Sequence, residues 1–148
     1  MKPENSVAIS GPSIAPATDN EPSKKNEKKL QMTLEAGHAG TVVLRCQGRI
    51  MFRSEARALS SIVAEVLPSA RRMVVDLAEI DSIDSGGLGE LVLIHMWAEA
   101  AGYMMSFASP QKSLRHLFEI TNLASVFDIY ATVAEAMAAM VQEQIQPA

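Results

Sequence analysis

Two Asp-Ser pairs, Asp81-Ser82 and Asp84-Ser85, stand directly before a glycine-rich segment at 86–89. A serine in such a place could be a nucleophile, part of a phosphate cradle, a helix cap or a residue that another protein modifies. The phosphate-cradle motifs do not fit, because "GGLGEL" holds neither a Gly-Lys-Ser/Thr triplet nor the spacing G-x-G-x-x-G. We therefore expect no intrinsic nucleotide site.

A catalytic serine needs a base within hydrogen-bond reach. His95 follows Ser85 by ten residues, which places it roughly 15 Å away along a helix axis. The other histidines, His38 and His116, have no metal-ligand spacing, and Cys46 is the single cysteine. We expect no enzymatic activity, no cofactor and no metal, with His95 partly buried and His116 on the surface.

Ser85 is predicted to be the N-cap of a helix that runs to about Ala101 and ends at Gly102. Gly86 and Gly87 would let the chain turn tightly into this helix. Free amides and the positive end of the helix dipole would then favour a negative group on the serine. A phosphate at Ser85 would thus be tolerated by the fold.

The flanking sequence alternates strands and helices, which indicates an α/β fold with a mixed, mostly parallel sheet. Ser54 is expected to cap the first helix, and Pro68 to mark its end. Strands are expected over 30–36, 41–48, 71–77, 103–109 and 125–130, and helices over 54–67, 85–101, 112–123 and 132–145. We therefore expect about five strands, the last of them short or merely extended, and about four helices.

Residues 1–29 contain four prolines and no aromatic residue, which predicts a disordered N-terminal tail before one domain over 30–148. That domain holds eight basic and thirteen acidic residues. Such a balance disfavours nucleic acid as a partner, because nucleic-acid affinity comes largely from Lys and Arg. No signal peptide and no apolar run of about 18 residues is present, so we expect a cytoplasmic protein without membrane insertion.

The segment "RRMVVDLAEIDSIDSGGLGELVLI", residues 71–94, resembles the central part of STAS domains. The shared features are an apolar strand ending in Asp-Leu and an Asp-Ser-x-Gly-Leu-Gly sequence that opens a helix. The resemblance extends to "CQGRI", "LRHLFEITNLASVFDIY" and "TVAEAM", and covers roughly 30–142. It implies the STAS fold.

Resemblance to stand-alone members implies an anti-sigma factor antagonist that regulates transcription through sigma factor release. Its partner would be an anti-sigma factor with serine kinase activity, which phosphorylates Ser85 and is then released; a phosphoserine phosphatase would restore binding. Gly86 stands where a Ser or Thr is often found, and Ser82, in the expected loop, is a poor second acceptor. The alternative is a STAS protein-interaction subunit of a lipid-transport or stress-signalling complex, in which Ser85 is only a cap.

The partner surface is expected around the start of the second helix. Glu79, Asp81, Asp84 and Glu90 would form an acidic rim that suits a basic patch on the partner. The predicted partner-binding residues are Asp81, Asp84, Ser85, Gly86, Gly87, Leu88, Glu90, Ile94 and Trp97.

The second helix is apolar nearly all round. Angular spacing turns Leu88, Leu91, Val92 and His95 to the sheet and leaves Leu93, Ile94 and Trp97 outward or sideways. Trp97 is either a hot spot for a partner or packed under a neighbouring segment. Arg49, Arg53 and Arg57 are interpreted as solvated arginines, with a phosphate or an acidic partner as the alternative.

Overall fold

The chain folds around one six-stranded mixed sheet in a computed structural model that describes residues 6–10 and 29–145. The strands are β1 (Ser6–Ser10), β2 (Gln31–Ala36), β3 (Val42–Ile50), β4 (Arg72–Ile83), β5 (Met104–Ala108) and β6 (Ile129–Tyr130). The helices are α1 (Ser54–Ala70), α2 (Ser85–Ala101), α3 (Lys112–Ile120) and α4 (Val133–Ile145). The predicted α/β order of elements from 30 onward is confirmed.

The strands lie in the sheet in chain order, β1 to β6. β1, β2 and β3 pair antiparallel, whereas β3, β4, β5 and β6 pair parallel. The expected lack of structure over 1–29 is wrong for Ser6–Ser10, whose backbone pairs with β2 from Ser6 opposite Glu35 to Ser10 opposite Gln31. The rest of that prediction, over 1–5 and 11–28, lies outside the described residues.

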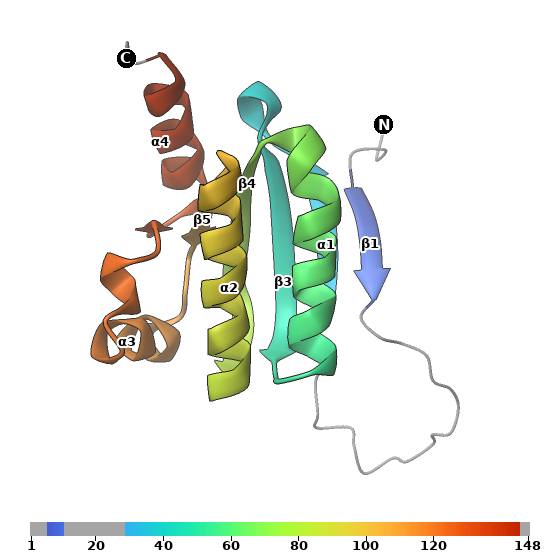
Figure 1. The fold of residues 1–148 in the computed structure, drawn as a ribbon, viewed down its shortest axis with the longest axis vertical. Coiled ribbons are helices and arrows are strands. Elements are labelled where there is room, and N and C mark those ends of the chain that lie inside the picture. The colour runs from blue at the N-terminus through green and yellow to red at the C-terminus, as the bar shows by residue number, and fades with distance from the viewer. Residues whose placement is uncertain (1–5, 11–28, 146–148) are drawn as a thin grey trace.

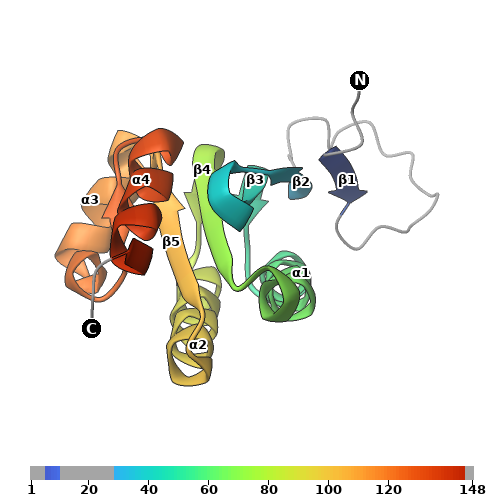
Figure 2. The ribbon, with the colours of Figure 1, turned by 90° about the horizontal axis from the view of Figure 1, so that it is seen from above.

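Helices cover both faces of the sheet. α1 and α2 lie side by side on one face, and α4 lies on the other face over β4 and β5 (Figure 2). Alternation along β3 explains the two layers, because Leu44 turns into the larger core and Val43 into the smaller one under α4. Each fully buried Leu or Phe side chain contributes about 1.5–3 kcal/mol, so these cores hold the helices against the sheet.

The ends of α1 differ from the predicted ones. Arg53, with φ 73°, occupies the N-cap position and makes no side-chain cap, so Ser54 is the first helical residue rather than the cap. Pro68 lies inside the helix, which continues to Ala70. Pro68 is exposed in the last turn, where a missing N–H and the ring disturb few helical bonds.

β4 is longer than predicted and sets the geometry of the site. Residues expected to form a loop, including Ser82, continue the strand as far as Ile83, which pairs with Ile50 at the end of β3. The parallel strands β3 and β4 therefore end side by side, and α1 and α2 both begin at that edge of the sheet (Figure 1).

Candidate functional site

Asp84, and not Ser85, caps α2. The Gly87 amide donates to Asp84 Oδ1 at 2.8 Å, and the Phe52 amide donates to Asp84 Oδ2 at 3.1 Å. The carboxylate thus ties the start of α2 to the chain that leaves β3, through hydrogen bonds that its charge strengthens. The prediction of Ser85 as the cap is wrong, because the neighbouring carboxylate satisfies the orphan amide instead.

Ser85 is the first residue of α2 and is exposed. Among the described residues, nothing accepts from or donates to its hydroxyl. The Ser85 side chain therefore does not cap the helix, in contrast to the prediction from the sequence. Its position is nonetheless fixed, since the Asp84 carboxylate holds the backbone on both sides of it.

The two glycines after Ser85 are required by close packing rather than by an unusual backbone conformation. A Cβ on Gly87 would lie 2.2 Å from the Ile50 carbonyl oxygen, and a Cβ on Gly86 would lie 2.4 Å from Phe52 Cδ1. Gly89 has open space around it. The α2 start therefore presses against the end of β3 at a distance that only glycine permits.

The outward face of α2 carries apolar side chains. Leu93, Met96 and Trp97 are 63%, 56% and 38% exposed. The expectation that Ile94 faces outward is wrong: it is 6% exposed and lies one turn after the buried Leu91.

Trp97 is partly exposed, and its ring also contacts the Tyr103 ring at a tilt, with 5.6 Å between ring centroids. Its role as a hot spot for a partner stays a prediction. Leu88 and Gly87 are buried, so these two predicted contact residues face the sheet.

The predicted acidic rim is partly used inside the molecule. Glu90 Oε2 accepts from Ser60 Oγ at 2.7 Å, which links α2 to α1, and Asp84 is occupied in the cap. Glu79 and Asp81 are exposed on the last part of β4. The rim therefore keeps its negative charge, but the carboxylates of Asp84 and Glu90 are held in place by contacts inside the molecule.

In the described part of the chain, no hydrogen bond joins the Ser85 hydroxyl to a histidine or a carboxylate. His95 is buried more deeply than expected, at 4% exposure, and packs edge-on against Phe127 at 5.3 Å. His116 is exposed, as predicted. Over 6–10 and 29–145, no group of three His, Cys, Asp or Glu side chains could hold a metal ion. None of the helices described is long and apolar enough to cross a membrane.

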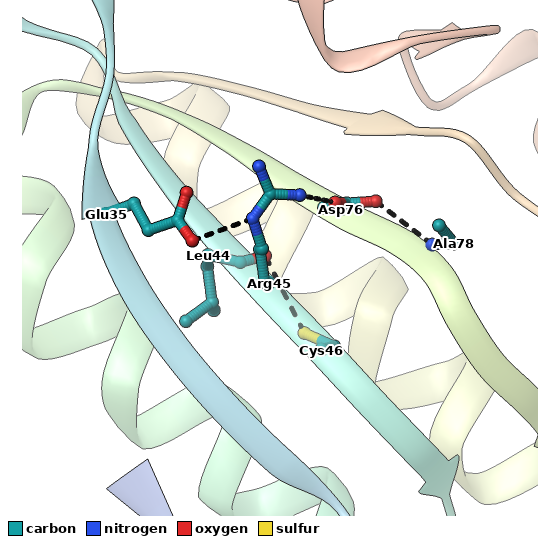
Figure 3. Close-up of polar contacts among 6 residues, drawn as sticks. All are labelled: Glu35, Leu44, Arg45, Cys46, Asp76 and Ala78. Atoms are coloured by element: carbon teal, nitrogen blue, oxygen red, sulfur yellow. Dashed lines mark hydrogen bonds and ion pairs between the residues drawn. The ribbon is translucent and has the colours of Figure 1, made fainter. Parts of the chain in front are cut away.

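A charged network that the sequence analysis missed holds the middle strands together (Figure 3). Arg45 on β3 bridges Glu35 on β2, at 2.9 Å from Nε to Oε2, and the buried Asp76 on β4. Asp76 also accepts from the Ala78 amide at 3.0 Å. An aspartate inside the apolar run "VVDL" was the available signal, because a buried carboxylate requires partners.

This network also affects nearby titratable groups. The pKa of Arg45 is raised, first by its hydrogen bond to Glu35 and then by the charges of Glu35 and Asp76, although burial opposes the shift. The pKa of the Cys46 thiol is raised by burial and, to a smaller extent, by Asp76. Cys46 is thus an inert core residue, in keeping with its predicted place in a strand.

Comparison with known proteins agrees with this architecture. The family model for the STAS domain matches residues 34–136. A candidate anti-sigma factor antagonist of Thermotoga neapolitana is 32% identical over 66 residues, which cover 45% of this chain and 58% of that protein. The alignment therefore spans little more than half the length of this relative.

Solved structures share the fold. An anti-sigma factor antagonist from Mycobacterium paratuberculosis superimposes with a TM-score of 0.65 at 22% identity, over 75% of this chain and 93% of that one. The antagonist SpoIIAA in its unphosphorylated form gives 0.62 at 18% identity, over 75% and 96%. The phosphorylated form of SpoIIAA from Bacillus gives 0.57 at 19%, over 74% and 98%. Because the matched family segment covers more than half of the sequence, the chain belongs to the STAS domain family.

Proposed function

We propose that this chain is an anti-sigma factor antagonist whose unphosphorylated form binds an anti-sigma factor with serine kinase activity. Phosphorylation of Ser85 by that partner would end the complex, and a phosphoserine phosphatase would restore it. The observation that carries the proposal is the exposed Ser85 hydroxyl, unengaged at the first residue of α2. The chain supplies a hydroxyl and a docking surface, and the partner supplies the catalysis.

A phosphate on Ser85 suits the fold. The first turn of α2 carries unpaired amides and the positive end of a 17-residue helix, which favour a negative group by about 0.3–1 kcal/mol. The Asp84 cap satisfies one of these amides without using Ser85. SpoIIAA, which shares this fold, exists in both unphosphorylated and phosphorylated forms. We therefore infer that the modification changes the surface and leaves the domain folded.

The proposed docking surface combines Ser85 with the outward apolar face of α2. Leu93, Met96 and Trp97 supply apolar area, and a half-exposed Trp is a common interface anchor. Asp84 and Gly86 flank the serine in the chain, and Asp81 and Glu90 lie four residues before it and five residues after it. A phosphate of charge about −1.5 to −2 placed in this contact would have to lose its water, which opposes binding unless the partner offers a cation.

The charge balance of the domain fits a regulator of transcription that acts in the cytoplasm by binding other proteins. The domain from residue 30 onward holds more acids than bases, which suits a protein partner better than nucleic acid. Among the described residues, no hydrogen bond joins the Ser85 hydroxyl to a base that could activate it.

Charge substitutions at two nearby serines test the proposal. Ser85→Asp should weaken binding to the cognate anti-sigma factor by at least about tenfold, since a buried charge without a partner costs more than about 1.4 kcal/mol. Ser82→Asp, which adds the same charge at an exposed position three residues earlier, should weaken it much less. Immobilised Ser85→Ala and Ser85→Asp chains would capture the partner from native cells, and mass spectrometry would quantify an anti-sigma factor kinase in each.

Binding of Ser85→Asp as tight as that of the parent, with an unchanged melting temperature, would refute the phosphoswitch. A stoichiometric phosphate on Ser85→Ala after incubation with the kinase and ATP would place the acceptor elsewhere. Retention of the same partner by all variants would favour a STAS interaction subunit without regulation at Ser85.

A further inference from the structure

A basic hollow lies between the starts of α1 and α2. It measures about 390 Å³ and is lined by Phe52, Arg53, Ser54, Arg57 and Glu90. Both helices begin at the same edge of the sheet, beyond the ends of β3 and β4 (Figure 1). The hollow therefore opens on the same side of the molecule as the start of α2.

Two arginines supply the positive charge of this hollow. Arg53 and Arg57 are exposed, and no ion pair to either is found within the described residues. The Arg53 guanidinium lies over the Phe52 ring at 5.2 Å from its centroid, which orients it without neutralising it. The opposing carboxylate, Glu90, already accepts from Ser60. Glu90 keeps its charge in this contact and balances one of the two arginines, so the hollow stays net positive.

The hollow is adjacent to Ser85. The Phe52 ring stands against Gly86, where an added Cβ would be 2.4 Å away, and the Phe52 amide is bound to Asp84. The residues on both sides of Ser85 thus touch Phe52, which itself lines the hollow. An arginine side chain has the length to reach a phosphate on Ser85 from there, and its guanidinium can bind phosphate oxygens in a bidentate manner.

We propose that Arg53 and Arg57 capture the phosphate of phosphorylated Ser85 within the same chain. This inference rests on the proposed function, because it assigns a fate to the phosphate that the kinase would add. Capture pairs the two guanidiniums with the new phosphate, so both groups are withdrawn from the partner. It also shields the phosphate from a phosphatase, so the phosphorylated form returns slowly to the unphosphorylated one.

Phosphoserine placed at position 85 during protein synthesis makes the test independent of any kinase. The phosphate would be titrated by ³¹P NMR in the full chain, in the Arg53→Gln/Arg57→Gln double variant and in Arg71→Gln, whose arginine lies before β4 at the opposite end of the sheet. Nearby cations favour the dianion, so the phosphate pKa should be at least about half a unit lower in the parent than in the double variant. The Arg71→Gln protein should titrate like the parent.

The accessibility of the Ser85 phosphate to a phosphatase gives a second readout. A non-specific phosphatase should remove the phosphate several times faster from the double variant than from the parent or from Arg71→Gln. Inorganic phosphate alone, followed by its effect on arginine side-chain NMR signals, should bind the unphosphorylated chain and fail to bind the phosphorylated one.

Equal phosphate pKa values in the parent and in the double variant would overturn the capture. Equal binding of inorganic phosphate to the phosphorylated and unphosphorylated chains would overturn it as well, since the phosphate on Ser85 would then not occupy the hollow. Neither result bears on whether a kinase modifies Ser85. That question is answered by phosphosite mapping with the kinase, so the two proposals fail separately.

Discussion

Replacement of Gly87 by alanine should destabilise the domain by forcing α2 away from β3. The added Cβ would lie 2.2 Å from the Ile50 carbonyl oxygen and 3.0 Å from Ile83 Cγ1, and these neighbours are backbone and a packed core side chain. Ordinary contact begins near 3.4 Å, so the start of α2 must move by about 1.2 Å. Overpacking of this kind costs about 1–3 kcal/mol.

The movement also weakens the Asp84 cap, because the cap bond ends on the Gly87 amide itself. Loss of a cap costs about 0.5–2 kcal/mol, while alanine in place of glycine in a helix returns about 0.5–1 kcal/mol. We therefore expect Gly87→Ala to lower the free energy of unfolding by about 1–4 kcal/mol. For a domain of this size that corresponds to a fall in Tm of roughly 5 °C or more.

Gly89→Ala is the matched control, since Gly89 lies two residues further along α2 and has nothing within 4 Å of the added Cβ. It should stabilise the domain by about 0.5–1 kcal/mol through helix propensity alone. Urea denaturation followed by circular dichroism measures both. A change in the free energy of unfolding of the same sign for the two variants would refute the argument that Gly87 is needed for close packing against Ile50. A Gly87→Ala protein as stable as the parent would refute it as well.

Two further predictions follow from the contacts described above. Asp84→Ala should cost about 1–2 kcal/mol in urea denaturation, because the amides of Gly87 and Phe52 lose their acceptor. Cys46→Ala should remove part of the stability loss at alkaline pH: the raised pKa keeps the folded thiol protonated above its ordinary value of 9.0, while the unfolded thiol ionises. The stability that Cys46 contributes is therefore complete below pH 9 and is lost above it by about 1.4 kcal/mol per pH unit. The free energy of unfolding, measured against pH, should have the same slope for parent and variant below pH 9 and should fall more steeply for the parent above it.

Periodicity in the sequence predicted the order of the elements, because each helix from α1 to α4 buries a regular apolar stripe and each main strand an apolar run. The misjudged details all depend on tertiary contacts. Ser54 and Ser85 are sound caps by residue type, but the chain turns one residue earlier in each case. The apolar run of β1, Val7 to Ile9, is too short to predict a strand by itself, and its backbone pairs with the edge of β2.

The sequence located the start of α2 correctly but not its tertiary contacts, and the role of Ser85 there stays a prediction. The Asp-Ser pair and the glycines marked the start of α2, yet the sequence could not show that Phe52 lies against Gly86 or that Ile50 lies against Gly87. Ile94 was placed outward because an apolar helix gives little angular contrast with which to fix its phase. Arg53 lines the hollow near the start of α2, although it lies 32 residues before Ser85 in the chain, and sequence spacing does not reveal this proximity.

The contact of Trp97 with Tyr103 on the partly exposed face of α2 gives the protein a built-in optical reporter. Trp97 is the single tryptophan of the chain, so its emission comes from one known place. It stands on the same rigid helix as Ser85, 12 residues on, or about 18 Å along the axis. Binding of a partner across the outward face of α2 would dehydrate the indole and shift its emission to shorter wavelength. Docking can then be followed in real time with no label attached.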